Sequence, residues 1–93
     1  MSHVRIPPVL RASAGGNKVV DIEAATVGEA LRALATQYPG LQQQLWGEDG
    51  TLNRFVNVYL NDQDIRYLAE LETPVTLNDT IVVLPAMAGG AAP

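Results

Sequence analysis

The segment that most constrains the fold is residues 80–85, Thr-Ile-Val-Val-Leu-Pro, which is the most hydrophobic run in the chain. Four consecutive aliphatic residues fit a strand that lies in the middle of a sheet and is buried on both faces. Such a sheet needs further strands beside it and a layer of helix to cover it. The chain is therefore predicted to be a two-layer α+β domain with residues 80–85 as its central strand.

The main amphipathic helix is predicted between Thr26 and Tyr38, and a short helix at residues 41–46 is a further possibility. Thr26 and Glu29 have the spacing of a capping box, in which the Thr26 hydroxyl accepts a backbone N–H and Glu29 reaches back to the Thr26 N–H. The Tyr38-Pro39-Gly40 sequence ends the helix. Apolar residues recur every three or four positions, which places them on one face: Val27, Ala30, Leu31, Leu34 and Ala35.

The remaining strands are predicted from alternation and turn residues. Residues 4–7 and 18–22 form a hairpin around the Gly-rich turn at 14–17, with the prolines at 7 and 8 ending or bulging the first strand. Residues 54–60 alternate, with Val56, Val58 and Leu60 on one face. Residues 64–67 are predicted to be a short returning strand after the turn at Asn61-Asp62.

Length and composition exclude several classes of protein. A chain of 93 residues is one domain with little room for an enclosed active site. The net charge of −4 argues against non-specific nucleic-acid binding. The absence of cysteine excludes disulfides, and no apolar run is long enough to span a membrane, so a cytoplasmic protein is expected. His3 is too isolated for a metal site, and Asp62 and Asp64 are interpreted as turn residues.

The last residues suggest a tail. Residues 1–85 are interpreted as the folded domain and residues 86–93 as a flexible C-terminal tail that contains Gly89-Gly90. Two glycines without side chains can enter a narrow tunnel in a partner protein. A frayed C-terminus of no importance is the alternative, because terminal disorder is common and a lone Gly-Gly is a weak motif.

Four segments together carry a resemblance to a known family. They are residues 6–11 (Ile-Pro-Pro-Val-Leu-Arg), 28–31 (Gly-Glu-Ala-Leu), 54–66 (Arg-Phe-Val-Asn-Val-Tyr-Leu-Asn-Asp-Gln-Asp-Ile-Arg) and 77–90, which ends in Leu-Pro-Ala-Met-Ala-Gly-Gly. The chain resembles the ThiS/MoaD-type ubiquitin-like sulfur carriers, and most of all their CysO-type branch. The resemblance implies a β-grasp fold, with a mixed sheet of four to five strands packed on one main helix.

The resemblance also implies a function without catalysis by this chain. A ubiquitin-activating-enzyme-like adenylyltransferase would use ATP to adenylate the Gly90 carboxylate, and a sulfur donor would convert it to a thiocarboxylate for a sulfur-accepting synthase. Gly89, Ala88, Met87 and Ala86 would line the partner's tunnel. No bound cofactor or metal, and no catalytic residue, is expected. Arg54 and Arg66 are candidates for docking partners, although solvated surface arginines are equally common.

The three residues after Gly90 depart from the many family members that end at Gly-Gly. Ala91-Ala92-Pro93 places Gly90 in a peptide bond. The resemblance to members with similar short extensions implies trimming between Gly90 and Ala91 by a JAMM-type zinc peptidase. Loss of function or a cloning addition is the alternative. The favoured pathway is cysteine, methionine or natural-product assembly, with thiamine and molybdopterin synthesis as runners-up. A modifier joined to lysine through Gly90, and a binding module with an inert tail, remain open.

Overall fold

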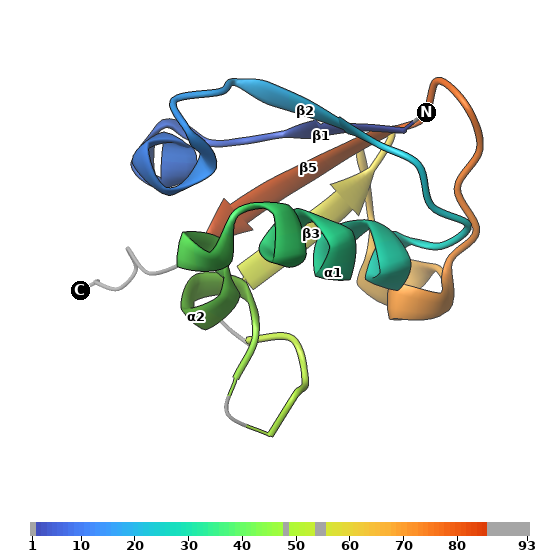
Figure 1. Ribbon diagram of the computed structural model, residues 1–93. Helices are drawn as coiled ribbons and strands as arrows, with labels where there is room; N and C mark the ends of the chain where they lie inside the picture. Colours follow the sequence, from blue (N-terminus) through green and yellow to red (C-terminus); the bar gives the residue numbers. More distant parts are fainter. Residues whose placement is uncertain (1, 48, 54–55, 86–93) are drawn as a thin grey trace.

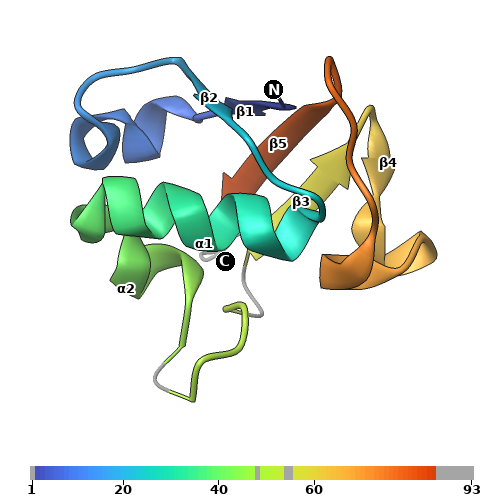
Figure 2. The same ribbon diagram turned by 45° about the vertical axis from the view of Figure 1, so that its right-hand side comes forward.

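The fold is a five-stranded mixed sheet covered on one face by helices (Figures 1 and 2). The computed structural model describes residues 2–47, 49–53 and 56–85. The strand order is β2-β1-β5-β3-β4. The strands are β1 (Ser2–Arg5), β2 (Val19–Ile22), β3 (Val56–Leu60), β4 (Gln63–Asp64) and β5 (Thr80–Pro85). The helices are α1 (Val27–Gln37), α2 (Gln42–Leu45) and four 3-10 segments, Pro8–Ala14, Pro39–Leu41, Ile65–Tyr67 and Glu70–Glu72.

β5 occupies the centre of the sheet, as its apolar sequence predicts. It runs parallel to β1, with Val4 opposite Ile81, and antiparallel to β3, with Val58 opposite Val83. The prediction that both faces of β5 are buried is wrong, because Leu84 is 43% exposed while Ile81 and Val83 are buried. The helices cover one face of the sheet only, so alternate residues of β5 point to the uncovered face.

The α1 helix follows its prediction closely. The Thr26 hydroxyl accepts the Glu29 N–H at 3.2 Å, and the whole predicted apolar face is buried in the core. The Glu29 carboxylate differs from its predicted role, because it accepts the N–H of Ala25 at 3.2 Å rather than that of Thr26. Ala25 belongs to the extended segment before the helix, where its backbone N–H has no partner within the helix. The Glu29 carboxylate supplies the hydrogen-bond acceptor that this N–H would otherwise lack. The helix ends at Tyr38 as predicted.

The hairpin of β1 and β2 forms, but its connection is not a tight turn. The first strand ends at Arg5 rather than at residue 7, because Pro7 and Pro8 cannot donate ladder hydrogen bonds. The chain then forms the 3-10 segment Pro8–Ala14, whose Leu10 and Ala14 are buried in the core. Gly15, at φ 67°, closes the segment and returns the chain towards β2.

The returning strand predicted at 64–67 is also shorter. β4 is Gln63–Asp64, and the backbone then turns into the 3-10 segment Ile65–Tyr67. The Asp64 carboxylate accepts the Arg66 N–H at 2.9 Å and so caps this segment. Capping by a local aspartate offers the backbone an alternative to the strand.

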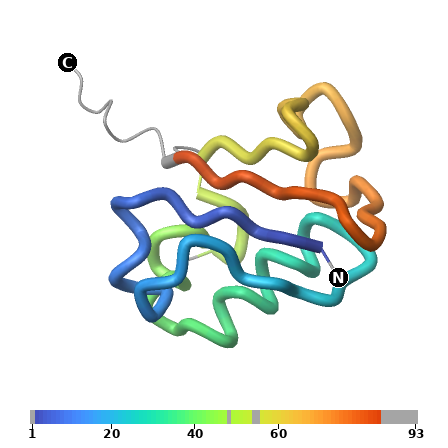
Figure 3. Tube along the Cα trace, turned by 90° about the horizontal axis from the view of Figure 1, so that it is seen from above, coloured from blue at the N-terminus to red at the C-terminus, as the bar shows by residue number. Residues whose placement is uncertain are grey.

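The two ends of the sheet differ in what they carry. β1 and β5 finish at the same end, where β2 and β3 begin, and we call this the exit end because the chain leaves β5 there. The opposite end, which we call the turn end, carries the Asn61-Asp62 turn, with φ 49° and 73°, and the start of β5. Figure 3 shows the end of β5 beside the chain that follows β1 at the exit end.

Candidate functional site

The residues predicted to carry and deliver sulfur lie outside the described part of the chain. These are Ala86, Met87, Ala88, Gly89, Gly90 and Ala91, and the docking candidate Arg54 lies outside it as well. The structure therefore describes the platform from which the tail departs.

The platform pairs β5 with β1 as far as Val82 and with β3 as far as Pro85. On one side Arg5 of β1 lies opposite Val82, and on the other side Val56 of β3 lies opposite Pro85. Ladder pairing therefore continues to the last described residue. The position and direction in which the chain leaves the domain are set by the sheet.

An apolar patch lies on the face of the sheet that no helix covers. We call Val19, Val82, Leu84 and Tyr59 the outer patch. Val19 is 46% exposed and Leu84 is 43% exposed, while Val82 and Tyr59 are half-buried. Tyr59 lies opposite Val82 in the ladder, and Arg5 lies opposite both Val19 and Val82. Arg5 therefore lies between Val19 and the other three members, and a mixture of exposed apolar side chains with an arginine is common in protein-binding surfaces.

Sequence reasoning missed the outer patch because it placed all four aliphatic residues of 81–84 in the core. One signal could have found it. The sequence contains one long amphipathic helix, and a single helical layer covers one face of a sheet. The second face of the central strand must then be exposed.

Arg66, the described docking candidate, is engaged by Asp64. Its Nη2 lies 2.7 Å from Asp64 Oδ2 and its Nε lies 3.1 Å from the same oxygen. The side-chain hydrogen bonds from Arg66 hold the pKa of Asp64 below its usual value, and the same pairing raises the pKa of Arg66. Because the guanidinium is engaged by Asp64, the structure favours a local role for Arg66.

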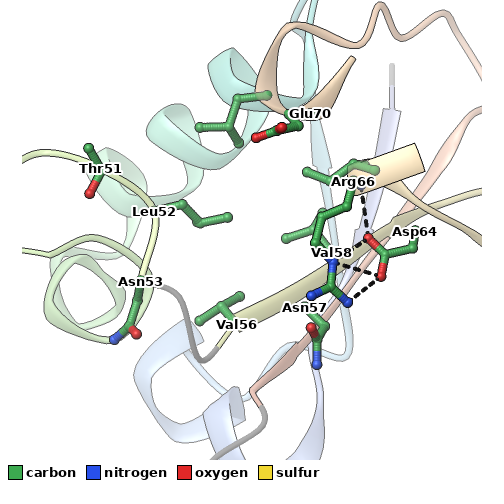
Figure 4. A pocket seen from close by; sticks show the side chains of 11 residues that line it. Thr51, Leu52, Asn53, Val56, Asn57, Val58, Asp64, Arg66 and Glu70 are labelled. Atoms are coloured by element: carbon green, nitrogen blue, oxygen red, sulfur yellow. Dashed lines mark hydrogen bonds and ion pairs between the residues drawn. The ribbon is translucent and has the colours of Figure 1, made fainter. Parts of the chain in front are cut away.

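A cavity of about 450 Å³ lies beside this ion pair (Figure 4). Its apolar part comes from Leu52, Val56 and Val58, together with Ile65 and Leu71. Among its described lining residues the ionisable ones are Asp64, Arg66 and Glu70, and the first two are paired with each other. The Asp64 carboxylate and the Arg66 guanidinium therefore engage each other at the edge of this cavity.

His3 and Asp62, the other polar residues considered in the sequence, have local structural roles. His3 Nδ1 lies 2.6 Å from Asp21 Oδ1, and Asp62 occupies the turn as predicted, at φ 73°. Within residues 2–47, 49–53 and 56–85, no three His, Cys, Asp or Glu side chains gather as a metal site would require. None of the helices in that part of the chain has the length and apolar character needed to cross a bilayer.

Comparison with known proteins places the chain among small carriers. The model of the ThiS family matches residues 4–90. Sulfur carrier protein CysO of Mycobacterium tuberculosis is 39% identical over 89 residues, covering 94% of this chain and 96% of that protein. Small archaeal modifier protein 1 of Haloferax volcanii is 32% identical over 82 residues, covering 85% of this chain and 90% of that protein.

The solved structures agree with the fold. A chain in the crystal structure of the Amycolatopsis orientalis BexX/CysO complex superimposes with a TM-score of 0.86 at 41% identity, covering 97% of this chain and 100% of that chain. The predicted β-grasp fold is therefore confirmed, as is the resemblance to CysO-type carriers. This protein belongs to the ThiS family of ubiquitin-like sulfur carriers.

Proposed function

We propose that this protein carries sulfur as a thiocarboxylate at Gly90 and acts as a protein substrate of partner enzymes rather than as a catalyst. The observation that carries the proposal is the fixed departure of the chain from β5, whose pairing extends to Pro85, opposite Val56. Gly89-Gly90 follows a few residues later. The similarity to a named sulfur carrier over nearly the whole chain supports the same conclusion.

The chemistry requires activation of the Gly90 carboxylate by an adenylyltransferase that uses ATP. A carboxylate is a poor electrophile, so its oxygen first attacks the α-phosphorus of ATP and releases pyrophosphate. Hydrosulfide from a sulfur donor then attacks the acyl carbon and displaces AMP, which leaves a thiocarboxylate with no change in oxidation state. The sulfur is the nucleophile towards an acceptor bound to a synthase, and this carrier supplies position while the partners supply catalysis.

The length of the tail suits delivery into a partner. From Pro85 to Gly90 an extended chain reaches about 17–20 Å. Ala86, Ala88, Gly89 and Gly90 have small side chains or none, which suits a narrow tunnel. The outer patch, beside the exit of the tail, is the surface against which the partner would rest.

Trimming must precede activation, because Gly90 is followed by Ala91-Ala92-Pro93. A zinc-dependent peptidase of the JAMM type, acting between Gly90 and Ala91, would free the carboxylate. The processed chain is expected to work in the cytoplasm with its adenylyltransferase and synthase, without nucleic acid or membrane.

The relatives favour one pathway and leave a second function open. The name of the Mycobacterium tuberculosis relative favours cysteine biosynthesis over methionine or natural-product assembly, and over thiamine or molybdopterin synthesis. The Haloferax volcanii modifier favours a second candidate, attachment of Gly90 to lysine amines of target proteins. Both functions share the adenylation step.

The intact mass of the protein purified from its native host tests the proposal. The expected species ends at Gly90 and has one oxygen replaced by sulfur. A variant that ends at Gly89, expressed in the same host, is the control and should not gain sulfur. Lysine conjugates without any sulfur-containing species would favour the modifier. Recovery of only the chain through Pro93, with the peptidase and adenylyltransferase supplied, would overturn both.

A further inference from the structure

The charges of the domain are separated along the strands. Most described acidic residues lie in the half of the domain at the turn end: Asp21, Glu23, Glu29, Asp62, Glu70, Glu72 and Asp79. The exceptions among the described acidic residues are Asp49, in the loop after α2, and Asp64, which lies in the same cross-strand row as Arg5 and is paired with Arg66. The exit end therefore differs in charge from the molecule as a whole, whose net charge is −4.

Three cations gather at the exit end around Ile6. Arg5 precedes it in sequence, the Lys18 carbonyl accepts the Ile6 N–H at 2.8 Å, and Arg11 Nε donates to the Ile6 carbonyl at 3.0 Å. These hydrogen bonds tie three separate segments, the end of β1, the 3-10 segment Pro8–Ala14 and the start of β2, to one residue. We call Arg5, Arg11 and Lys18 the basic cluster.

The charge of the basic cluster is not neutralised within the described part of the chain. The ion pairs found there join His3 to Asp21 and Arg66 to Asp64, and none of the three cations takes part in them. Arg5 and Lys18 are exposed, whereas Arg11 is half-buried because it also holds the Ile6 carbonyl. Positive charge is therefore presented to solvent at this end.

The basic cluster lies beside the exit of the tail. Arg5 is opposite Val82 on the neighbouring parallel strand, and the chain leaves β5 three residues later, about 10 Å along the strand. Gly90 lies at most about 17–20 Å beyond Pro85. When the tail is fully inserted, the basic cluster must face the outer rim of the partner's tunnel and not the nucleotide at its end.

We propose that the basic cluster binds an acidic rim around the mouth of the adenylyltransferase tunnel and orients the carrier tail-first. The inference rests on the proposed function, because it concerns the partner of the same tail. The charge separation turns the exit end towards negative charge and the turn end away from it. Such complementarity acts mainly on the rate of association.

The experiment measures the association rate constant of the adenylyltransferase from the same genome with the chain ending at Gly90. Arg5→Gln/Lys18→Gln removes two charges from the basic cluster and spares Arg11, whose guanidinium holds the backbone. Gln63→Glu/Leu77→Glu is the control, because it changes the net charge equally at exposed positions of the turn end. Salt is varied from about 0.01 M to about 1 M, over which the Debye length falls from about 30 Å to about 3 Å.

The cluster variant should associate about tenfold more slowly at low salt, and its rate should approach that of the parent chain at high salt. Its adenylation rate at saturating carrier should be unchanged, and the control should keep the parent rate. Equal association rate constants for the cluster variant and the parent chain at low salt would overturn the proposal. If the control variant lost as much of its association rate as the cluster variant, the effect would be one of net charge alone, and this would overturn the proposal too. Salt-dependent binding of an RNA oligonucleotide by the parent chain, lost in the cluster variant, would overturn it in favour of a nucleic-acid surface. Failure of the parent chain to be adenylated would instead count against the proposed function.

Discussion

Replacing Leu84 with threonine tests whether the outer patch contacts the activating enzyme. Leu84 lies on the uncovered face of β5 and is 43% exposed, so binding can bury less than half of its side chain. Complete burial of a leucine contributes about 1.5–3 kcal/mol, and 43% of that is about 0.6–1.3 kcal/mol. The loss corresponds to a factor of about 3–9 in affinity. Threonine is β-branched and suits the strand, so the fold should be kept.

The assay is ATP–pyrophosphate exchange by the adenylyltransferase, with the concentration of the carrier ending at Gly90 varied. Leu84→Thr should raise KM for the carrier by about 3–9-fold and leave kcat unchanged, because the lost contact is made equally before and during the reaction. Leu77→Thr is the matched control, since Leu77 is 68% exposed but lies near the turn end. An unchanged KM for Leu84→Thr, or an equal rise for Leu77→Thr, would refute the reasoning. Thermal melting of both variants excludes a loss of folding as the cause.

Three further predictions concern the platform itself. Leu31→Ala, at a fully buried position of α1, should lower the free energy of unfolding by about 2–5 kcal/mol in urea titrations, and a loss below about 1 kcal/mol would contradict the packing described. Thr26→Ala removes the cap on the Glu29 N–H and should cost about 1 kcal/mol by the same measurement, whereas the exposed Thr36→Ala serves as its control. Hydrogen bonds from the Asn61 amide and from Thr76 hold the pKa of Asp79 in the folded protein below its usual value. The ionised Asp79 carboxylate therefore contributes its full stabilisation when the pH is above the usual pKa of aspartate. This stabilisation is lost as the pH falls through the lower pKa of the folded protein. The stability difference between the parent and Asp79→Asn should therefore shrink as the pH is lowered below about 4, and a constant difference would show that the carboxylate is not responsible.

Local chemistry made much of the fold predictable. The Thr26 cap, the Pro39 stop and the spacing of the buried leucines specify α1 through contacts within the helix and with one neighbouring surface. The central place of β5 follows from its apolar content. Exposure of Leu84 was not predictable from residues 80–85 alone, because the number of helical layers in the whole chain decides whether a second face is covered.

The irregular segments were less accessible to sequence reasoning. Residues 8–14 form a 3-10 segment because buried Leu10 and Ala14 anchor it to the core, and this tertiary effect leaves no regular pattern. The Arg66–Asp64 pair was missed for a similar reason, since it forms where the chain turns from β4 into a 3-10 segment that Asp64 caps. The tail site was predicted from its resemblance to a family, and its residues lie beyond the described chain.

The position of β5 between two strands has a mechanical consequence. Force applied along the tail, by a partner that withdraws the carrier or by an unfoldase that grips it, pulls β5 lengthwise through the sheet. The hydrogen bonds to β1 and β3 are then strained simultaneously rather than one after another, and they flank the strand on both sides. Resistance to such pulling depends on the barrier to unfolding and not on equilibrium stability. The domain should therefore withstand repeated loading and release through its C-terminus better than one whose tail leaves from an edge strand.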